Sequence, residues 1–487
     1  MTATSVCAVA DRLVWTPRPE QGALLSFAGE RERRAWWATM GSGKTAAAIE
    51  HLRRAHEDSF SLDTALVVAP NLVAKHTWPK EFAKWAHGAP IGPVRVLTHA
   101  DFGFKRTCDV LDGPGRLAMS DWREVRKRLL GYRERVHIIQ WDWFWWLVKA
   151  LNRSSHYSHV IYDEATFASD HESQRWKAAR YLTKELGCGD VLEMTGGPAP
   201  NGYEKLWAQM FLLDGGMRLG RTLTEFRYSW MVPDKMDGST GRVFKWKVNP
   251  ARKGELDKLL SELAISVVVD LGVESKVIDH RLPLPDDAQA IYDEVERDFI
   301  HHFSPDSHVL VGSKAVMVGK LLQIAQGAVY DQDRMVQHVH DVKLDRLEEI
   351  IDSSPRGVLL AYAYQHDFER LKKRFKFAKH IKDAGNIQRF ANGSIKLLCM
   401  HPASGAHGVD ELQYGGHTCV WFGVPYNWEH YSQFNARLVR GGQKETVFIH
   451  RILMEGTIEE DVADVSLAEK CDEETALLRA CQWRYRE

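Results

Sequence analysis

Short apolar, β-branched segments recur along the first half of the chain, and each is followed by a polar turn and then by a helical pattern. Strands that alternate with helices in this way predict a parallel sheet covered by helices on both faces. The segments lie at residues 65–69, 94–98, 136–140, 160–162 and 191–195. We therefore predict an α/β fold for this half.

The alternation stops after about residue 220 and resumes later. The intervening residues are aromatic and basic around 226–246, strand-like at 265–271 and helical near 287–303. Apolar segments at 357–362, 395–400, 417–422 and 446–452 then restore the first pattern. We predict an N-terminal α/β lobe over 1–220, a connecting region with helical character over 221–300, and a second α/β lobe over 301–487 that ends in a polar helical tail.

The composition is that of an ordinary globular protein. The chain has 487 residues, 44% hydrophobic and 26% charged, and its net charge of −1 means that any nucleic-acid surface must be local. Its seven cysteines are scattered without a CxxC pair, which favours a reducing cytoplasm over a zinc site or a disulfide framework. We expect no signal peptide, because the N-terminus lacks a basic start and Asp11 interrupts its short apolar stretch. We also expect no membrane span, because no apolar run approaches about 18 residues.

A phosphate-binding loop is the strongest local signal. Residues 38–45 read Ala-Thr-Met-Gly-Ser-Gly-Lys-Thr. Glycines allow the tight turn that points backbone N–H groups at phosphate oxygens, the lysine reaches the terminal phosphates, and the threonine hydroxyl binds magnesium. A chance glycine-rich turn is the alternative. The residues expected to bind ATP and Mg²⁺ here are Met40, Gly41, Ser42, Gly43, Lys44 and Thr45.

An acidic pair supports this interpretation. Residues 160–166 read Val-Ile-Tyr-Asp-Glu-Ala-Thr, an apolar strand that ends in two acids. An open α/β sheet presents its catalytic groups at such strand ends. We predict that Asp163 holds the magnesium ion through water and that Glu164 orients and deprotonates the attacking water.

These motifs, together with others in the first half, resemble the Swi/Snf-type branch of the superfamily two helicase-fold ATPases, especially the compact bacterial and phage members. Residues 17–21 resemble the adenine-reading segment, in which Gln21 contacts the base. Residues 66–72 and 78–85 resemble a DNA-contacting motif, which implies that Pro70 and Asn71 touch DNA. Residues 194–201 and 204–207 resemble the TGxPxxN…ELW motif, in which Thr195 couples hydrolysis to DNA.

The resemblance continues in the second half. Residues 401–408 resemble a motif that touches both DNA, here through Ser404, and the nucleotide, here through Gly408. Residues 433–443 resemble the QxxxRxxRxGQ motif: Gln433 then lies at the nucleotide, and Arg437 and Arg440 face its γ-phosphate across the cleft. A rigid, permanently charged guanidinium suits developing phosphoryl charge.

Three positions depart from the family pattern or leave alternatives open. The acid box reads DEAT where DEGH or DEAH is usual, so Thr166 stands in the fourth position, and an extra residue after Gly408 leaves Asp410 without an assignment. Tyr426 stands where tryptophan is usual, and it either stacks on a nucleotide of the DNA or packs within its loop. The aromatic run at 141–146 fits a buried helix start better than a base-stacking platform.

The resemblance implies two RecA-like lobes that hydrolyse ATP and move along double-stranded DNA, displacing or remodelling bound proteins. A strand-separating DNA or RNA helicase is the first alternative. A module that binds DNA or a partner and uses ATP only as a clamp is the second. We expect the protein in the cytoplasm of a bacterial or phage-infected cell.

Overall fold

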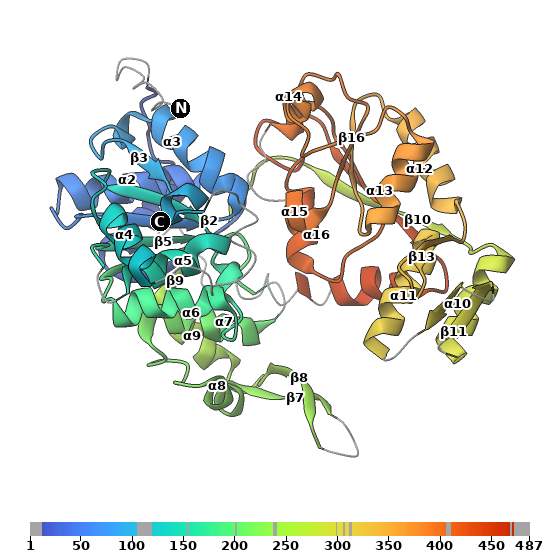
Figure 1. Cartoon of the computed structure of the whole chain (residues 1–487), viewed down its shortest axis with the longest axis horizontal. Coiled ribbons are helices and arrows are strands. Elements are labelled where there is room, and N and C mark those ends of the chain that lie inside the picture. The colour runs from blue at the N-terminus through green and yellow to red at the C-terminus, as the bar shows by residue number, and fades with distance from the viewer. Residues whose placement is uncertain are drawn as a thin grey trace. The chain divides into compact units, whose positions relative to one another are not determined.

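The chain folds into two compact units, one built from residues up to Val269 and the other from Asp270 to Asp472 (Figure 1). The computed structural model describes residues 12–104, 119–152, 155–199, 202–236, 241–298, 300–304, 307–310, 314–405, 411–467 and 470–471. Among these residues no helix is both long enough and apolar enough to cross a membrane.

The first unit contains a seven-stranded sheet in which every pairing is parallel. Across the sheet the strands are β3 (Val94–Val96), β4 (Val136–Gln140), β2 (Ala65–Ala69), β5 (His159–Asp163), β6 (Asp190–Thr195), β1 (Arg33–Ala38) and β9 (Ala264–Val267). Strands β1, β2, β4 and β5 are almost entirely buried along their length, which explains why apolar residues predominate in them.

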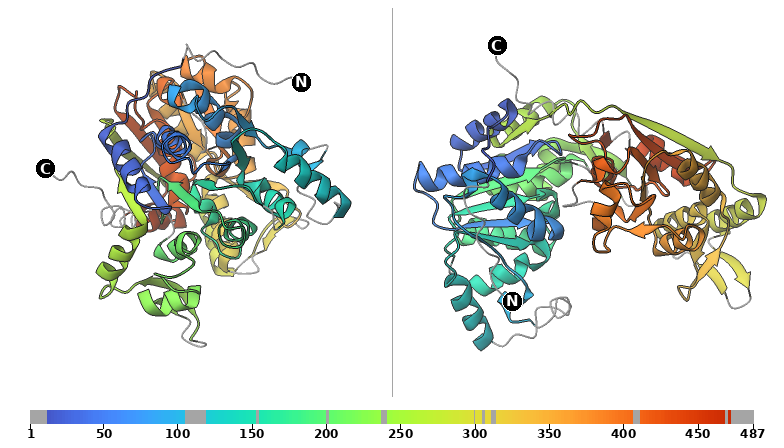
Figure 2. Two further views of the ribbon diagram at one scale, coloured as in Figure 1. Left: turned by 90° about the vertical axis from the view of Figure 1, so that its left-hand side faces the viewer. Right: turned by 90° about the horizontal axis from the view of Figure 1, so that it is seen from above.

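Helices cover both faces of this sheet (Figure 2). Successive residues of a strand point to opposite faces, so Trp36 packs in one core and Trp37 in the other. One core is completed by α1 (Pro19–Gly29), α2 (Lys44–Glu57) and α3 (Trp78–Lys84). The other is completed by α4 (Met119–Leu130), α5 (Trp141–Leu151), α6 (Gln174–Arg180), α7 (Leu206–Asp214), α8 (Leu223–Trp230) and α9 (Lys253–Leu263).

A separate antiparallel hairpin interrupts the first unit between α8 and α9. It consists of β7 (Met231–Met236) and β8 (Val243–Val248), and it extends beyond the sheet and its helices (Figure 1). Its register shifts around Pro233–Met236. The hairpin is therefore an added element and not part of the main sheet.

The second unit contains a six-stranded parallel sheet. Its strands lie in the order β10 (Ser275–Leu282), β19 (Val447–Met454), β18 (Thr418–Trp421), β15 (Val358–Ala361), β17 (Leu397–Met400) and β16 (Lys379–His380). The helices are α10 (Asp286–Asp298), α11 (Lys314–Gln326), α12 (Val342–Ser353), α13 (Gln365–Arg374), α14 (Asn386–Ala391), α15 (Pro402–Gly405), α16 (Trp428–Asn435) and α17 (Ile458–Glu460).

One face of the second sheet packs against α10 to α13, and on the other face Trp421 stacks on Tyr431 of α16. Two small hairpins add β11 (Ile300–Ser304) with β12 (Ser307–Leu310), and β13 (Ala328–Tyr330) with β14 (Val336–His338). Short 3₁₀ or π turns complete the two units: η2 (Val73–Thr77), η3 (Ala86–Gly88), η4 (His99–Phe102), η6 (Ala165–Ala168), η7 (Tyr181–Glu185), η8 (Tyr203–Lys205), η9 (Leu412–Tyr414) and η10 (Asp461–Ser466).

The predicted fold class, α/β with two parallel sheets flanked by helices, is confirmed. Residues 221–269 belong to the first unit and 270–300 to the second, and the three-part division remains a prediction. The helix expected near 287–303 ends at Asp298, and residues 300–304 form a strand instead, paired with β12.

Candidate active site

The predicted catalytic residues of the first half gather at one edge of the first sheet. Asp163 and Thr195 are the last residues of β5 and β6, and the phosphate loop follows β1 directly. Because β6 lies between β1 and β5 and all three run parallel, their carboxyl ends meet at this edge. The fold thereby brings together segments separated by more than a hundred residues.

The phosphate loop has the backbone that its glycines predict. Gly41 and Gly43 have φ values of 79° and 78°, and Gly43 caps the N-terminus of the 14-residue helix α2. A left-handed conformation is easy only for glycine, and the helix start offers N–H groups and a positive dipole end to an anion. Lys44 begins the helix, and its ammonium group donates to the carbonyl of Ala38, across the loop.

Two side chains at the start of α1 donate hydrogen bonds to backbone carbonyls of the phosphate loop. The amide nitrogen of Gln21 donates to the carbonyls of Ser42 and Gly43, each at 3.2 Å. The guanidinium group of Arg18 donates to the carbonyls of Gly41, at 3.3 Å, and Ser42. Gln21 is therefore beside the loop as the adenine-reading motif requires. Arg18 was not singled out as a functional residue, although it lies inside the recognised 17–21 segment.

Asp163 is held between two tryptophans. The indole N–H of Trp78 donates to its carboxylate at 2.8 Å, and the indole of Trp141 donates to its backbone carbonyl at 2.9 Å. Burial, and next the charge of Glu164, raise the pKa of Asp163 to about 6, although Trp78 and Lys44 oppose the shift. The carboxyl is thus positioned, and binding of a cation beside it would favour its ionised form.

Glu164 is connected directly to the threonine of the next motif. The hydroxyl of Thr195 lies 3.2 Å from the carboxylate of Glu164, to which it donates. Glu164 has a φ of 53°, a left-handed backbone that is uncommon outside glycine and is found at functional sites. Thr195 is only 1% exposed, so its side chain faces Glu164 and not solvent.

These residues fit ATP and magnesium. Gly43 has no room for a side chain, because a Cβ there would lie 2.3 Å from the amide nitrogen of Gln21. Thr45 and Asp163 supply the hydroxyl and carboxylate oxygens that magnesium prefers. Gly196 lies against Met40 and the Lys44 ammonium, since a Cβ on Gly196 would be 3.6 Å and 3.9 Å from them. The chemistry that the loop predicts is therefore compatible with the side chains around it.

The predicted residues of the second half lie on and after α16 of the second unit. The buried Gln433 donates its amide to Glu429 at 3.0 Å, and the Nε of Arg437 donates to the backbone carbonyl of Gln433 at 3.2 Å. Arg440 follows three residues after Arg437, beyond the end of α16, and is half-buried. Ser404 lies on α15, and Gly408 lies outside the described residues.

The remaining motif residues differ in exposure. Pro70 is buried and Asn71 is exposed, directly after β2, while Tyr426 is 39% exposed in the loop before α16. Trp78, part of the segment matched to a DNA-contacting motif, is fully buried against Asp163. The aromatic run at 141–146 packs largely into the core, as its preferred interpretation predicted; its most buried members are Trp141, Trp143, Phe144 and Trp146.

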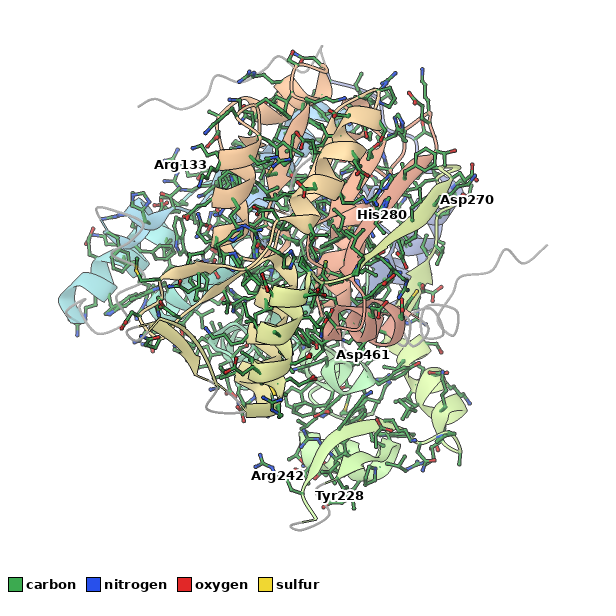
Figure 3. All side chains as sticks on the ribbon, turned by 90° about the vertical axis from the view of Figure 1, so that its right-hand side faces the viewer. Arg133, Tyr228, Arg242, Asp270, His280 and Asp461 are labelled. Carbon is green, nitrogen blue, oxygen red and sulfur yellow. The ribbon has the colours of Figure 1, made fainter. Side chains whose placement is uncertain are left out.

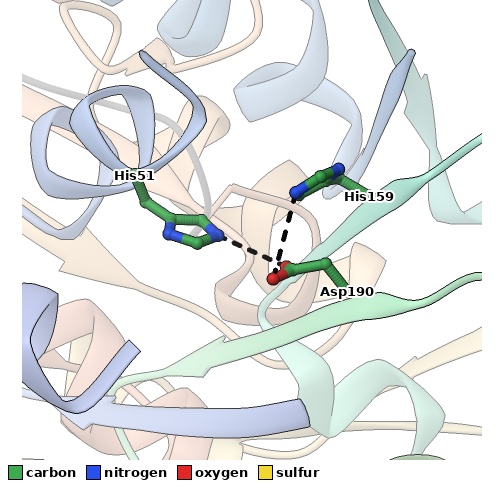
Figure 4. A group of neighbouring side chains, drawn as sticks. All are labelled: His51, His159 and Asp190. Atoms are coloured by element: carbon green, nitrogen blue, oxygen red, sulfur yellow. Dashed lines mark hydrogen bonds and ion pairs between the residues drawn. The ribbon is translucent and has the colours of Figure 1, made fainter. Parts of the chain in front are cut away.

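A cluster at the opposite edge of the sheet has the composition of a metal site (Figure 4). His51, His159 and Asp190 place their donor atoms within 4.8 Å of one another. However, the fully buried guanidinium of Arg34 pairs with Asp190 at 2.6 Å and contacts His51. Burial lowers the pKa of His159 to about 4. Burial alone would raise the pKa of Asp190, but its bond to His51 and the charge of Arg34 hold it well below its usual range. We conclude that Arg34 already supplies the cation of this network.

The fold and site define a class of protein: an α/β ATPase with a phosphate loop, a strand-end acid pair and two parallel-sheet units. The model of the SNF2-related domain matches residues 38–238. Putative protein p41 of Acyrthosiphon pisum secondary endosymbiont phage 1 is 30% identical over 470 residues, which cover 92% of this chain and 95% of that protein. The chain belongs to the SNF2-related family.

Two longer relatives match almost the whole chain. An uncharacterized ATP-dependent helicase, MG018 of Mycoplasma genitalium, is 25% identical over 88% of this chain. The human DNA repair and recombination protein RAD54-like is 23% identical over 87% of this chain. The matched regions cover 38% and 60% of those two proteins, so each is considerably longer than the part that this chain resembles.

Proposed function

We propose that this protein hydrolyses ATP in order to move along double-stranded DNA and to displace or remodel bound proteins. The observation that carries the proposal is the hydrogen bond between Thr195 and Glu164. Glu164 is the residue assigned to the attacking water, and Thr195 belongs to the motif that, by resemblance, couples hydrolysis to DNA. A movement of the Thr195 loop on DNA would therefore change the position of the hydrolytic carboxylate without any intermediary.

The residues of the first unit divide the chemistry among them. Lys44 and the loop N–H groups bind the phosphates, and Thr45 and Asp163 would hold a magnesium ion, which when bound would neutralise phosphate charge. Glu164 orients the attacking water and accepts its proton. Gln21, already bonded to the loop carbonyls, reads the adenine base beside the phosphates.

The second unit contributes the residues that make turnover depend on closure. We propose that Arg437 and Arg440 stabilise the transferring phosphoryl group, with Gln433 and Gly408 at the nucleotide. A guanidinium delivered from a second lobe acts only when the lobes approach, which links the ATP cycle to alternating open and closed states. This role is supported by the QxxxRxxRxGQ spacing.

DNA contacts are proposed at the loops that the family motifs mark. Asn71 and Tyr426 are exposed and can reach DNA directly, whereas Pro70 and Thr195 are buried and would act by shaping their loops. Ser404 completes the set. Contacts of a translocase must fall on phosphates and sugars, because it must accept every sequence that it crosses.

A paired displacement experiment tests the function. ATP turnover is measured with double-stranded DNA, single-stranded DNA and RNA, and then a triplex-displacement assay is run beside a forked-duplex unwinding assay at one ATP concentration. We expect stimulation by double-stranded DNA, displacement of the third strand and an intact fork. Efficient fork unwinding, or stimulation by RNA alone, would instead establish the strand-separating helicase.

A further inference from the structure

Gln443, the last residue of the QxxxRxxRxGQ segment, has no part in the chemistry assigned so far. It lies in the loop between α16 and β19, three residues after Arg440, and it is half-buried. The loop leads into β19, whose neighbours in the sheet are β18 and β10, the strand that carries His280 (Figure 3). Gln443 is therefore close enough along the chain to influence the backbone at Arg440.

Residues 440–443 form a tight turn. The backbone N–H of Gln443 donates to the carbonyl of Arg440 at 3.1 Å, the bond that closes a four-residue turn. Gly442, the third residue of the turn, has a φ of 96°, and a type II turn requires a positive φ at that place. Tyr414 packs against the same glycine, because a Cβ on Gly442 would lie 3.0 Å from the Tyr414 hydroxyl. Position 442 therefore requires glycine for its conformation and for its surroundings.

The side chain of Gln443 fixes this turn to the segment that precedes β18. Its amide nitrogen donates to the carbonyls of Gln413 and Gly416, each at 3.0 Å. Its amide oxygen accepts from the backbone N–H groups of Lys444 and Glu445, at 3.0 and 3.2 Å. An amide has two N–H donors and an oxygen with two lone pairs. Four backbone groups therefore use the whole hydrogen-bonding capacity of this side chain.

An anchor at this place matters because Arg440 lies outside regular structure. Helix α16 ends at Asn435 and β19 begins at Val447, so Arg440 belongs to the irregular segment between them. Groups carried by loops are held less precisely than groups on helices or strands, and they depend on supporting hydrogen bonds. A misplacement of about 1 Å can cost about 10²-fold in rate. The turn that contains Arg440 therefore needs the support that Gln443 supplies.

The entry to β19 has anchors of its own. Glu445 pairs with Arg356 at 3.0 Å and lies 3.1 Å from the ring of His417. The hydroxyl of Thr446 donates to Glu274 at 2.9 Å, next to the start of β10. Removal of the Gln443 amide should therefore loosen the turn at Arg440 and leave the strand in place.

We propose that Gln443 is a positioning residue that holds the guanidinium of Arg440 at the γ-phosphate through the 440–443 turn. Because its amide is fully bonded to the backbone, Gln443 acts through Arg440 and not on the nucleotide. This inference rests on the proposed role of Arg440 and adds the residue that fixes its place. A tie that served stability alone would affect turnover equally with and without Arg440.

Two substitutions remove the anchor in different ways. Gln443→Ala removes all the hydrogen bonds of the side chain. Gln443→Glu keeps its size but replaces the donating nitrogen by an oxygen, so that the carbonyls of Gln413 and Gly416 lose their donor. Gln337→Ala is the matched control, because Gln337 is also a half-buried glutamine of the second unit, and its amide donates to Asp331 at 2.8 Å. Thermal melting shows whether each variant is folded.

The experiment uses the full chain with double-stranded DNA and magnesium. Turnover is measured together with equilibrium affinities for ADP, for a non-hydrolysable ATP analogue, and for ADP with aluminium fluoride, which mimics the transferring phosphoryl group. The same measurements on Arg440→Ala and on Gln443→Ala/Arg440→Ala complete a double-mutant cycle. The cycle separates an effect exerted through Arg440 from one exerted on the fold.

We expect Gln443→Ala and Gln443→Glu to lower turnover by roughly 10- to 100-fold. Both should weaken the complex with ADP and aluminium fluoride in proportion and leave the affinities for ADP and the ATP analogue unchanged. In the Arg440→Ala background, Gln443→Ala should have no further effect, and Gln337→Ala should match the wild type.

Four results would overturn the role of Gln443 alone: normal turnover of the folded variants, an equal loss in both backgrounds, the same loss in Gln337→Ala, or unfolding of both Gln443 variants. Near-normal turnover of Arg440→Ala would overturn the proposed role of Arg440 and, with it, this inference. The two failures are therefore distinguishable.

Discussion

Replacing Asp163 by asparagine tests the electrostatics of the active site in the absence of nucleotide. The carboxyl is buried at the end of β5, and its pKa is raised from 3.8 to about 6, first by burial and then by the charge of Glu164. Asparagine has nearly the same shape and carries no charge, and its carbonyl oxygen can still accept the hydrogen bond from Trp78. The substitution therefore removes the charge and preserves the packing.

The expected magnitude follows from the shift. A change of about two pKa units corresponds to about 3 kcal/mol between the two protonation states. Because the pKa is higher in the folded protein than in the unfolded chain, the folded state binds the proton more tightly. The stability that this group contributes is fully present below about pH 4 and is lost as the pH rises through 6. The asparagine variant does not experience this loss.

The assay is urea unfolding of both proteins without nucleotide, from pH 4.5 to pH 7.5. Intrinsic fluorescence reports mainly on the first unit, which contains most of the tryptophans, and Trp78 and Trp141 contact Asp163 directly. Relative to the wild type, Asp163→Asn should gain about 2 kcal/mol in unfolding free energy across this range, because part of the full effect is already present at pH 4.5. The exposed Asp142→Asn serves as the control, because an exposed ion pair such as Asp142–Arg175 contributes little.

Two results would refute this reasoning. A difference between the proteins that does not change with pH would mean that Asp163 titrates in the folded chain as it does in the unfolded one. A wild type that becomes relatively more stable as the pH rises would mean that its ionised form is favoured by the fold. Asp163→Asn should in either case lose magnesium-dependent stabilisation by ATP if Asp163 holds the ion.

Three further predictions concern the same site. Lys44→Ala should lose nucleotide affinity together with turnover, whereas Glu164→Gln should bind ATP and hydrolyse it poorly; equal turnover of Glu164→Gln and wild type would contradict the assignment. Arg440→Ala should reduce turnover by roughly 10³-fold or more with ATP binding retained in equilibrium titration, and near-normal turnover would make the motif structural. Gly43→Ala should cost about 1–2 kcal/mol for the left-handed backbone and more for the clash with Gln21. Thermal melting of Gly43→Ala, Gln21→Ala and Gly43→Ala/Gln21→Ala separates the two costs, because the Gln21→Ala protein measures the loss of the hydrogen bonds of Gln21 and the difference that remains in the cycle is the clash.

Strands buried on both faces were predictable, and strands with polar sequences were not. The segment at 65–69 is apolar throughout, and the segment at 136–140 is apolar except for the buried His137 and Gln140, because both lie in the middle of a sheet covered on both sides. By contrast, β1 begins with two arginines and was not predicted; Arg34 is nevertheless fully buried, because Asp190 neutralises it. Similarly, β10 is an edge strand with a largely exposed, polar sequence, and only its pairing with β19 makes it a strand.

The same distinction between features that could be predicted from the sequence and features that could not holds for the candidate site. The identities of Lys44, Asp163 and Glu164 could be predicted, because phosphate and magnesium chemistry requires particular residue types at short spacings. The partners of these residues could not, since Trp78 and Thr195 lie 85 and 31 positions from the acids that they contact. Trp78 even belongs to a segment whose resemblance suggested a DNA contact, and only burial shows that its indole supports Asp163.

The sequence by itself determined the α/β class, the phosphate loop and the acid pair. Hydrophobic periodicity and short sequence motifs depend only on residues that are neighbours in the chain. Only the tertiary structure decided how strands far apart in the chain are ordered, which polar groups are buried together, and that the β7–β8 hairpin is separate from the main sheet. The physical reason is that each of these properties depends on contacts between distant segments. The pKa of Asp163 rises, and Arg34 becomes buried beside Asp190, only after those segments have packed together.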